Sequence, residues 1–128
     1  MTTWTGNELS KIGSADELQI ASLRGDGTLN KPVIIWVVRL GDDLYIRSYK
    51  GHNGAWFRTA LLRHAGHIWA GGVEKDVAYV EELDPHINDQ IDSAYKSKYK
   101  SLPQYVAPML TADVRSTTLK LVPRSKDD

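Results

Sequence analysis

The residues best suited to chemistry lie in one short segment, SYKGHNGAW, which runs from Ser48 to Trp56. It combines two glycines with a hydroxyl, an ammonium, an imidazole, an amide and two aromatic side chains. A connecting turn needs only the glycines and the asparagine. Backbone N–H groups in a glycine-containing turn, followed by the N-terminus of a helix, form a binding site for an anion. The segment therefore predicts a site for a phosphate group.

Nearby side chains strengthen this prediction. Lys50 and Arg47 would add positive charge, Ser48 would donate a hydrogen bond, and Arg58 lies one turn into the helix that follows. A second interpretation needs no ligand: the segment ends a hairpin, Asn53 caps the helix, and the charged side chains are solvated. The residue types alone leave both interpretations open.

Other chemistries have less support. The four histidines lack acidic partners at the spacing of metal ligands, so no metal site is predicted. Ser48, His52 and Asp76 supply the residue types of a catalytic triad, but no strand–turn–helix nucleophile motif accompanies them. Glu74 and Asp76 fall on one face of a strand, where they would face water or, alternatively, form the carboxylate pair of a hydrolase.

Composition indicates one globular domain over residues 1–128. Sixteen basic residues balance sixteen acidic ones, which argues against a nucleic-acid partner, although residues 94–100 (AYKSKYK) interleave lysine and tyrosine as nucleic-acid surfaces do. The absence of cysteine excludes disulfides, thiolate metal sites and cysteine nucleophiles. No signal peptide is visible at the N-terminus and no apolar run approaches the ~20 residues that span a bilayer. We therefore expect a cytoplasmic protein with no membrane partner.

Hydrophobic periodicity predicts five or six strands and two or three short helices. Helices are expected from a Thr5–Glu8 capping box to Gly13, at 55–64, and at 84–100 after an Asp-Pro start. Strands are expected at 17–24, 33–40, 44–48, 67–70, 73–82 and 116–124. Residues 101–109, SLPQYVAPM, are expected to form a proline-punctuated loop.

The run VIIWVVRL at residues 33–40 is the strongest predicted strand. Apolar residues occupy both of its faces, so both faces should be covered, either in a barrel wall or in a homodimer interface. Hairpin-linked strands in the middle of the chain indicate an α+β fold, a small and mainly antiparallel β-barrel with helices at its edges.

The order of these segments resembles an uncharacterised bacterial domain family, with ELQIASLR, DLYIRSYKG, GAWFR, AYKSKYK and LKLVPR as its anchors. That family in turn resembles the split β-barrel flavin- and deazaflavin-dependent nitroreductase superfamily. There, a glycine- and arginine-rich turn precedes a long hairpin, a serine- and glycine-containing loop ends it, and a helix begins at a tryptophan. The corresponding segments here are LRGDGTLNKP, SYKGHNGAW and WFRTAL.

The resemblance implies an FMN or deazaflavin cofactor and places Arg24 and Lys31 near the basic turn residues that meet its phosphate. Two departures weaken the pattern. Asp26 stands where the superfamily usually has a basic or small residue, and Thr59 replaces the asparagine of the helix.

In the same resemblance, Ser48, Lys50 and Gly51 match the loop that holds the phosphate and the ribityl chain. Trp56 and Arg58 match the start of the helix that closes the pocket. The implied activity is hydride transfer to a small organic substrate, for which the cofactor supplies the chemistry. The alternatives are a non-redox module that binds another small ligand or a peptide, and a purely structural protein with a filled barrel.

Overall fold

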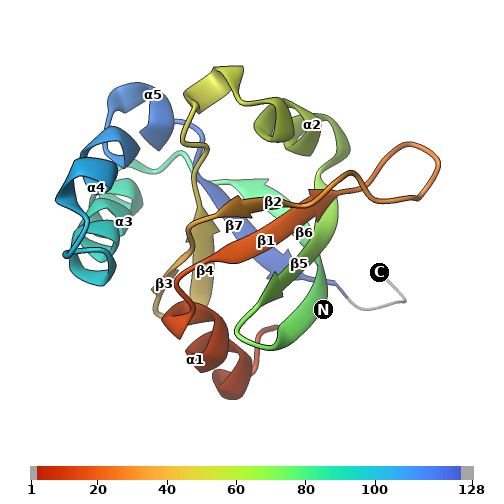
Figure 1. The fold of residues 1–128 in the computed structure, drawn as a ribbon, viewed down its shortest axis with the longest axis horizontal. Helices are drawn as coiled ribbons and strands as arrows, with labels where there is room; N and C mark the ends of the chain where they lie inside the picture. Colours follow the sequence, from red (N-terminus) through yellow and green to blue (C-terminus); the bar gives the residue numbers. More distant parts are fainter. Residues whose placement is uncertain (1–2, 125–128) are drawn as a thin grey trace.

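The computed structural model describes residues 3–124, which form a curled β-sheet surrounded by helices (Figure 1). The strands are β1 (Leu18–Ser22), β2 (Val33–Ile35), β3 (Val38–Leu40), β4 (Asp43–Ile46), β5 (Ala65–Ala70), β6 (Val73–Glu81) and β7 (Leu119–Pro123). They pair in the order β2-β1-β5-β6-β7-β4-β3, and every pairing is antiparallel. The predicted α+β class is confirmed. The predicted count of five or six strands is wrong, because residues 3–124 contain seven.

The additional strand arises because the run at residues 33–40 is divided in two. Its first half, β2, pairs with β1, and its second half, β3, pairs with β4. These two strands are the opposite edges of the sheet. One short connection, Trp36–Val37, therefore passes from one edge to the other and closes the curled sheet.

Side chains from a helix replace the missing strand partners at this break. The Val37 carbonyl accepts hydrogen bonds from Lys98 Nζ at 2.6 Å and from the Tyr99 hydroxyl at 3.3 Å, and the Val37 N–H lies 3.4 Å from the same hydroxyl. Val37 is fully buried, so its polar backbone groups need these partners. Hydrophobic periodicity cannot detect such a break, because Val37 is as apolar as its neighbours.

The helices are α1 (Gly6–Ser14), α2 (Ala55–Arg63), α3 (Pro85–Lys98), α4 (Pro103–Met109) and α5 (Ala112–Arg115), with a 3-10 turn η1 (Gly51–Asn53). The predicted capping box at the start of α1 and the aspartate cap of α3 are both present. Figure 1 shows α3, α4 and α5 together at one side of the barrel, with α1 and α2 towards opposite ends. No helix within residues 3–124 is long and apolar enough to cross a membrane.

Helix α4 corrects the prediction of a loop at residues 101–109. Pro103 stands at its first position, where a missing N–H costs nothing, and Pro108 falls in its last turn. Val106 and Met109 are buried against the neighbouring helices, which stabilises a segment of weak intrinsic helix propensity. The described residues thus contain five α-helices rather than two or three.

Two hydrophobic clusters hold these layers together. One fills the barrel and includes Ile20, Leu44, Ile68 and Leu121. The other lies between β3, β4 and the group of helices α3, α4 and α5, and is rich in tyrosine. The second cluster fixes these helices beside the barrel, where one of them forms a wall of the cavity described below.

Buried tyrosines should make the free energy of unfolding depend on pH in the alkaline range. Burial raises the pKa of Tyr45 and of Tyr79 to about 12, and it also raises the pKa of Tyr95 and Tyr99. In the unfolded chain these phenols would ionise near pH ~10. Between the two values the folded chain retains protons that the unfolded chain has lost.

The free energy of unfolding is therefore expected to fall as the pH rises above about 10, by up to about 1.4 kcal/mol per pH unit for each retained proton. Below about pH 9 the tyrosines should have no effect on its pH dependence. Urea unfolding between pH 9 and 11.5 measures this slope. Tyr79→Phe should make it shallower, and an identical slope in the variant and the wild type would contradict the assignment.

Candidate functional site

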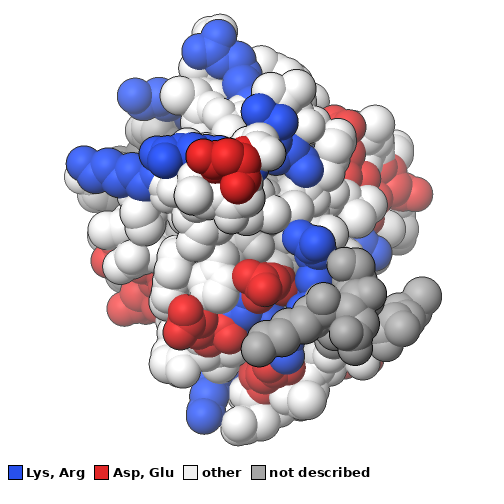
Figure 2. Space-filling view, turned by 90° about the vertical axis from the view of Figure 1, so that its right-hand side faces the viewer, with Lys and Arg blue, Asp and Glu red and all other residues white. Residues whose placement is uncertain are grey.

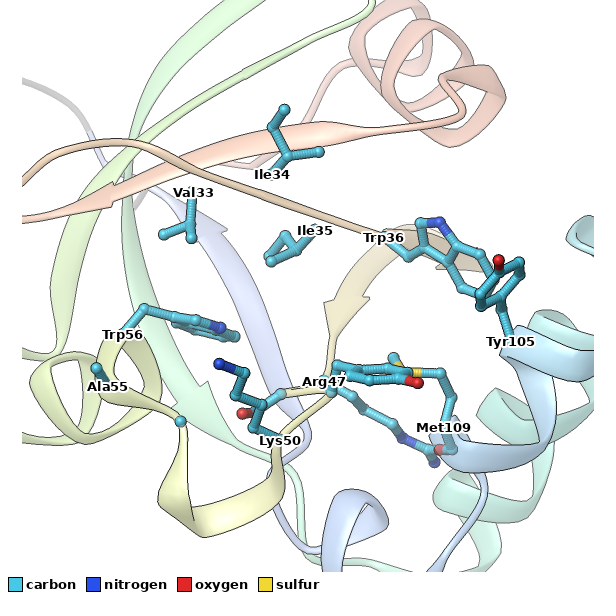
Figure 3. A pocket seen from close by; sticks show the side chains of 13 residues that line it. Val33, Ile34, Ile35, Trp36, Arg47, Lys50, Ala55, Trp56, Tyr105 and Met109 are labelled. Carbon is cyan, nitrogen blue, oxygen red and sulfur yellow. The ribbon is translucent and has the colours of Figure 1, made fainter.

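A cavity of about 460 Å³ opens between β2, the segment after β4, the start of α2, and α4 (Figure 3). This volume lies in the range of small-molecule sites. Its walls are mainly apolar and aromatic, with a few polar groups on one side. The lining residues are Val33, Ile34, Ile35, Trp36, Arg47, Ser48, Tyr49, Lys50, Gly54, Ala55, Trp56, Tyr105 and Met109.

The segment singled out in the sequence forms the polar side of this cavity. Its fold is fixed by internal hydrogen bonds: the Ser48 hydroxyl donates to the Gly51 carbonyl at 2.8 Å, and the Ser48 N–H donates to Thr117 Oγ1 at 2.9 Å. Gly51 has φ 65°, in the left-handed region that favours glycine. Ser48 and Gly51 therefore shape the loop, and their groups already have protein partners.

Helix α2 begins at the cavity without a side-chain cap. Its N-cap residue is Gly54, not Asn53, and no side chain accepts from the first N–H groups. Its first turn contains no acidic residue, and Ala55 and Trp56 line the cavity. A helix N-terminus carries a partial positive charge and free donors, so this edge of the cavity attracts an anion. The alternative in which Asn53 caps the helix is wrong.

Lys50 adds a full positive charge at the same edge. Figure 3 shows its side chain extending into the cavity towards the indole of Trp56. The side chain is exposed, and within residues 3–124 it forms no salt bridge. A phosphate or carboxylate bound here would meet Lys50 together with the first N–H groups of α2.

Arg47 lines the cavity too, but its guanidinium is occupied by the protein. It makes hydrogen bonds to Thr118 Oγ1, to Asp92 Oδ1, to the Met109 carbonyl, and to both the carbonyl and the side-chain oxygen of Asn88. Its side chain is fully buried. Arg47 therefore ties β4 to α3 and α4 and supports the cavity from behind, and no donor remains for a ligand.

Arg24 and Lys31 lie at a second hollow of about 370 Å³. Val33, Ala55 and Trp56 line both this hollow and the main cavity, so the two adjoin. The structure thus brings the predicted basic pair to the neighbourhood of the α2 N-terminus.

Basic side chains are also prominent on one side face of the molecule. Figure 2 shows Lys and Arg gathered in its upper part, at the height at which Figure 1 draws α2. Asp26 lies in the turn between β1 and β2, where its carboxylate accepts from the N–H and the hydroxyl of Thr28. These hydrogen bonds lower the pKa of Asp26, so its negative charge persists there at neutral pH.

Two predicted residues do not reach the cavity. Arg58 is exposed and is not among the lining residues. Gly51 faces Asp113 of α5, so closely that a side chain at Gly51 would collide with that carboxylate. Conversely, Tyr105 and Met109 line the cavity from α4. Neither was predicted as a site residue, because that segment was expected to be a loop.

The triad written from Ser48, His52 and Asp76 is not assembled. His52 Nδ1 lies 2.6 Å from Asp113 Oδ1, and the carboxylate of Asp76 lies 2.6 Å from His67 Nδ1. The hydroxyl of Ser48 is used within its own loop. Within residues 3–124 no group of three or more His, Cys, Asp or Glu side chains could hold a metal ion.

Several solved structures of other proteins have a similar fold. The chain is 15% identical to an FAD-binding protein from Mesorhizobium loti, with a TM-score of 0.59 and 97% of this chain and 93% of that chain covered. It is 11% identical to an F420-H2 dependent reductase (TM-score 0.60, 84% and 93% covered) and 12% identical to the heme storage protein HutZ from Vibrio cholerae (TM-score 0.70, 94% and 90% covered). The expected likeness to split-barrel flavin and deazaflavin proteins is thus confirmed for the fold.

The family to which the chain belongs is a smaller group than the proteins that share its fold, and no activity is assigned to that family. The chain belongs to a family of uncharacterised proteins conserved in bacteria (DUF2255), whose model matches residues 8–121. This confirms the family resemblance found in the sequence. Comparison with curated proteins finds no match.

Proposed function

We propose that this protein binds FMN or a deazaflavin in the main cavity and acts as an oxidoreductase that transfers a hydride to a small organic substrate. One observation carries the proposal. An apolar cavity with tryptophan and tyrosine walls meets an uncapped helix N-terminus and Lys50, which forms no salt bridge among residues 3–124. A cofactor made of a flat ring joined to a phosphate suits both parts of this site: the ring suits the apolar, aromatic walls and the phosphate suits the positively charged edge.

The cavity residues divide into two groups that suit such a cofactor. Trp36, Trp56 and Met109 would contact the ring, because aromatic and thioether side chains pack well on flat conjugated systems. Lys50 and the N–H groups at the start of α2 would bind the phosphate. Arg24 and Lys31 line the adjoining hollow and would bind a further negative group on the cofactor.

The bound cofactor would supply the hydride chemistry, so the protein needs no catalytic acid or base of its own. The cavity lining agrees with this, since the part of it formed by residues 3–124 contains no histidine, aspartate or glutamate. The role of the side chains is to orient the ring and to exclude water from it. Likeness to FAD-binding and F420-H2 dependent proteins supports the proposal at the level of the fold.

A second candidate is a small-ligand module without redox activity. It is favoured by the hydrogen bonding of Arg47, Ser48 and Gly51, whose groups are already committed to the protein. Fewer contacts then remain for a phosphate than the superfamily pattern implies. The same cavity would hold an apolar ligand with a single negative group.

We further propose a homodimer in which a second copy covers the rim of the cavity. Ile34 is 61% exposed and Val33 is 37% exposed, and both belong to edge strand β2, which pairs on only one side. Tyr49 and Tyr105 extend the same apolar rim. Sedimentation should show a dimer that Ile34→Lys dissociates, and a wild-type monomer at about 100 µM would contradict this.

Titration of the purified protein tests the proposed function. We expect FMN or a deazaflavin to bind with Kd below about 100 µM, or about −5.5 kcal/mol, measured by quenching of tryptophan or cofactor fluorescence. If neither binds at about 1 mM, the redox proposal is wrong. Binding of a non-redox anionic aromatic ligand in that case would support the second candidate.

A further inference from the structure

The imidazole of His52, which is not part of the main cavity, lies between a carboxylate and a hydroxyl. Its Nδ1 is 2.6 Å from Asp113 Oδ1, and its Nε2 is 3.5 Å from Ser116 Oγ. Because an ionised carboxylate only accepts, Nδ1 carries the proton of the first hydrogen bond, and a neutral ring then has its lone pair on Nε2. The Ser116 hydroxyl can donate to that lone pair. The order of carboxylate, imidazole and hydroxyl is that of a catalytic triad.

Two elements that are distant in the sequence hold these side chains together. His52 belongs to η1, whereas Asp113 lies in α5 and Ser116 directly follows that helix. Gly51 allows the close approach, because a side chain there would collide with the Asp113 carboxylate. The ring of His52 also stands nearly perpendicular to the buried ring of Phe57, 5.5 Å away between centroids. The imidazole is therefore oriented from two sides.

The Ser116 hydroxyl has two acceptors within reach. It lies 2.6 Å from the Asp113 carbonyl as well as 3.5 Å from His52 Nε2. Rotation about the Cβ–Oγ bond directs its proton to either one. A hydrogen bond between nucleophile and base is commonly this long before substrate binds, and it shortens in the complex.

A hollow of about 480 Å³ opens beside Ser116. Its apolar lining comes from Leu83, Pro85, Leu110 and Ala112. The side chain of Leu83 is 66% exposed, so an apolar group that entered the hollow would remove it from water. Ser116 is exposed at the same place, so a substrate can reach its hydroxyl from solvent. The hollow thus offers a place for the apolar part of a substrate next to the nucleophile.

We propose that Ser116, His52 and Asp113 form a second, hydrolytic site that cleaves small aryl esters. Ser116 Oγ attacks the acyl carbon while His52 Nε2 takes the hydroxyl proton. The C–O bond to the aryl group breaks, and the phenol leaves with that electron pair and the proton from His52. Water then attacks the acyl-serine and gives a proton to His52. The carboxylic acid leaves as Ser116 Oγ regains this proton.

The substrate class follows from what the site supplies. General-base assistance by a positioned imidazole accelerates a reaction by about 10²–10⁴-fold. Esters of phenols need least further help, because a phenolate is a good leaving group, and an aryl ring suits the apolar hollow. Asp113 is a positioning residue that fixes the tautomer of His52. The reaction uses neither the main cavity nor a cofactor, so this inference is independent of the proposed function.

Steady-state hydrolysis of 4-nitrophenyl acetate by the wild-type protein tests the proposal. We expect release of 4-nitrophenol to continue beyond one equivalent per protein, and Ser116→Ala and His52→Gln each to lower kcat/KM about 100-fold. Ser93→Ala is the matched control, because Ser93 is also exposed and also donates to a backbone carbonyl of its helix. Its kcat/KM should stay within about twofold of wild type. An undiminished rate in Ser116→Ala would overturn the proposal, because His52 would then act alone as an exposed imidazole.

A fluorophosphonate reagent tests the nucleophile by a stable product. The serine oxygen displaces fluoride from phosphorus, and peptide mass spectrometry locates the adduct. We expect Ser116 to be labelled at least about tenfold faster than Ser93 in the wild-type protein. Equal labelling of the two serines would refute the assignment.

Asp113→Asn separates the positioning role from a role in stability. The amide has the same size but no charge, so it no longer fixes the tautomer of His52. We expect kcat to fall at least about tenfold with KM unchanged. Because the side chain of Asp113 is exposed, the thermal unfolding midpoint should stay within about 2 °C of wild type. An unchanged kcat would show that the three side chains do not act as a triad.

Discussion

Replacing Arg47 by methionine is expected to lower the free energy of unfolding by about 3–5 kcal/mol. The methionine fills similar volume but removes the donors of Asp92 Oδ1, the Met109 carbonyl and the Asn88 carbonyl. Asp92 Oδ2 keeps its contact with Arg115, and Asn88 Oδ1 keeps the Thr118 hydroxyl. Buried acceptors that lose a charged partner bear the full cost of their desolvation. Urea unfolding followed by circular dichroism measures the change.

Arg58→Met is the matched control. It makes the same substitution at an exposed position on α2, so the free energy of unfolding should change by less than about 0.5 kcal/mol. A loss below about 1 kcal/mol in Arg47→Met would show that the guanidinium is not the anchor described here. Arg47 would then be free to serve a ligand, as its position in the sequence first indicated.

The second large effect is expected at the helix N-terminus. Ala55→Asp places a carboxylate at the first position of α2, at the edge of the cavity. An acidic residue there stabilises the helix by about 0.3–1 kcal/mol, so the fold should not suffer. A phosphate at the same place would be repelled, and we expect the affinity for FMN to fall about 100-fold.

Gly6→Asp provides the control for this variant. Gly6 is the first residue of α1, which like α2 has nine residues. Apart from its chain neighbours and the backbone of its own helix, no heavy atom of residues 3–124 lies within 4 Å of a Cβ added there. The same charge is introduced at the same helical position, so FMN affinity should stay within about twofold of wild type. Equal losses in both variants would indicate a general charge effect, and no loss in Ala55→Asp would place the phosphate elsewhere.

Local patterns in the sequence predicted much of the scaffold, because caps and periodicity depend on near neighbours. The Thr5–Glu8 capping box, the Asp84–Pro85 helix start and the hairpin of β3 and β4 all formed as predicted. The break at Trp36–Val37 could not be predicted, because its partners Lys98 and Tyr99 lie about 60 residues away. Long-range partners also explain α4. Its prolines led to the prediction of a loop, but Val106 and Met109 are buried against other parts of the fold and stabilise a helix.

The same distinction applies to the candidate site. Residue types predicted an anion site at the segment Ser48–Trp56. In the structure this segment lines a cavity into which Lys50 extends. Residue types could not reveal that Arg47 is already bound by Asp92 and Asn88. The sequence around a charged residue beside a glycine turn is the same whether its side chain is buried or free. Nor could they reveal the wall provided by α4, which depends on how three helices pack beside the barrel.

The central claim is that one negatively charged group is bound jointly by Lys50 and the first N–H groups of α2. Parallel titration of wild type and Lys50→Ala with FMN and with riboflavin, which lacks the phosphate, tests it most directly. We expect wild type to bind FMN at least about tenfold more tightly than riboflavin, and Lys50→Ala to reduce that preference about tenfold while riboflavin affinity is unchanged. Equal affinity of the wild type for FMN and riboflavin, or an unaltered preference in the variant, would contradict the account.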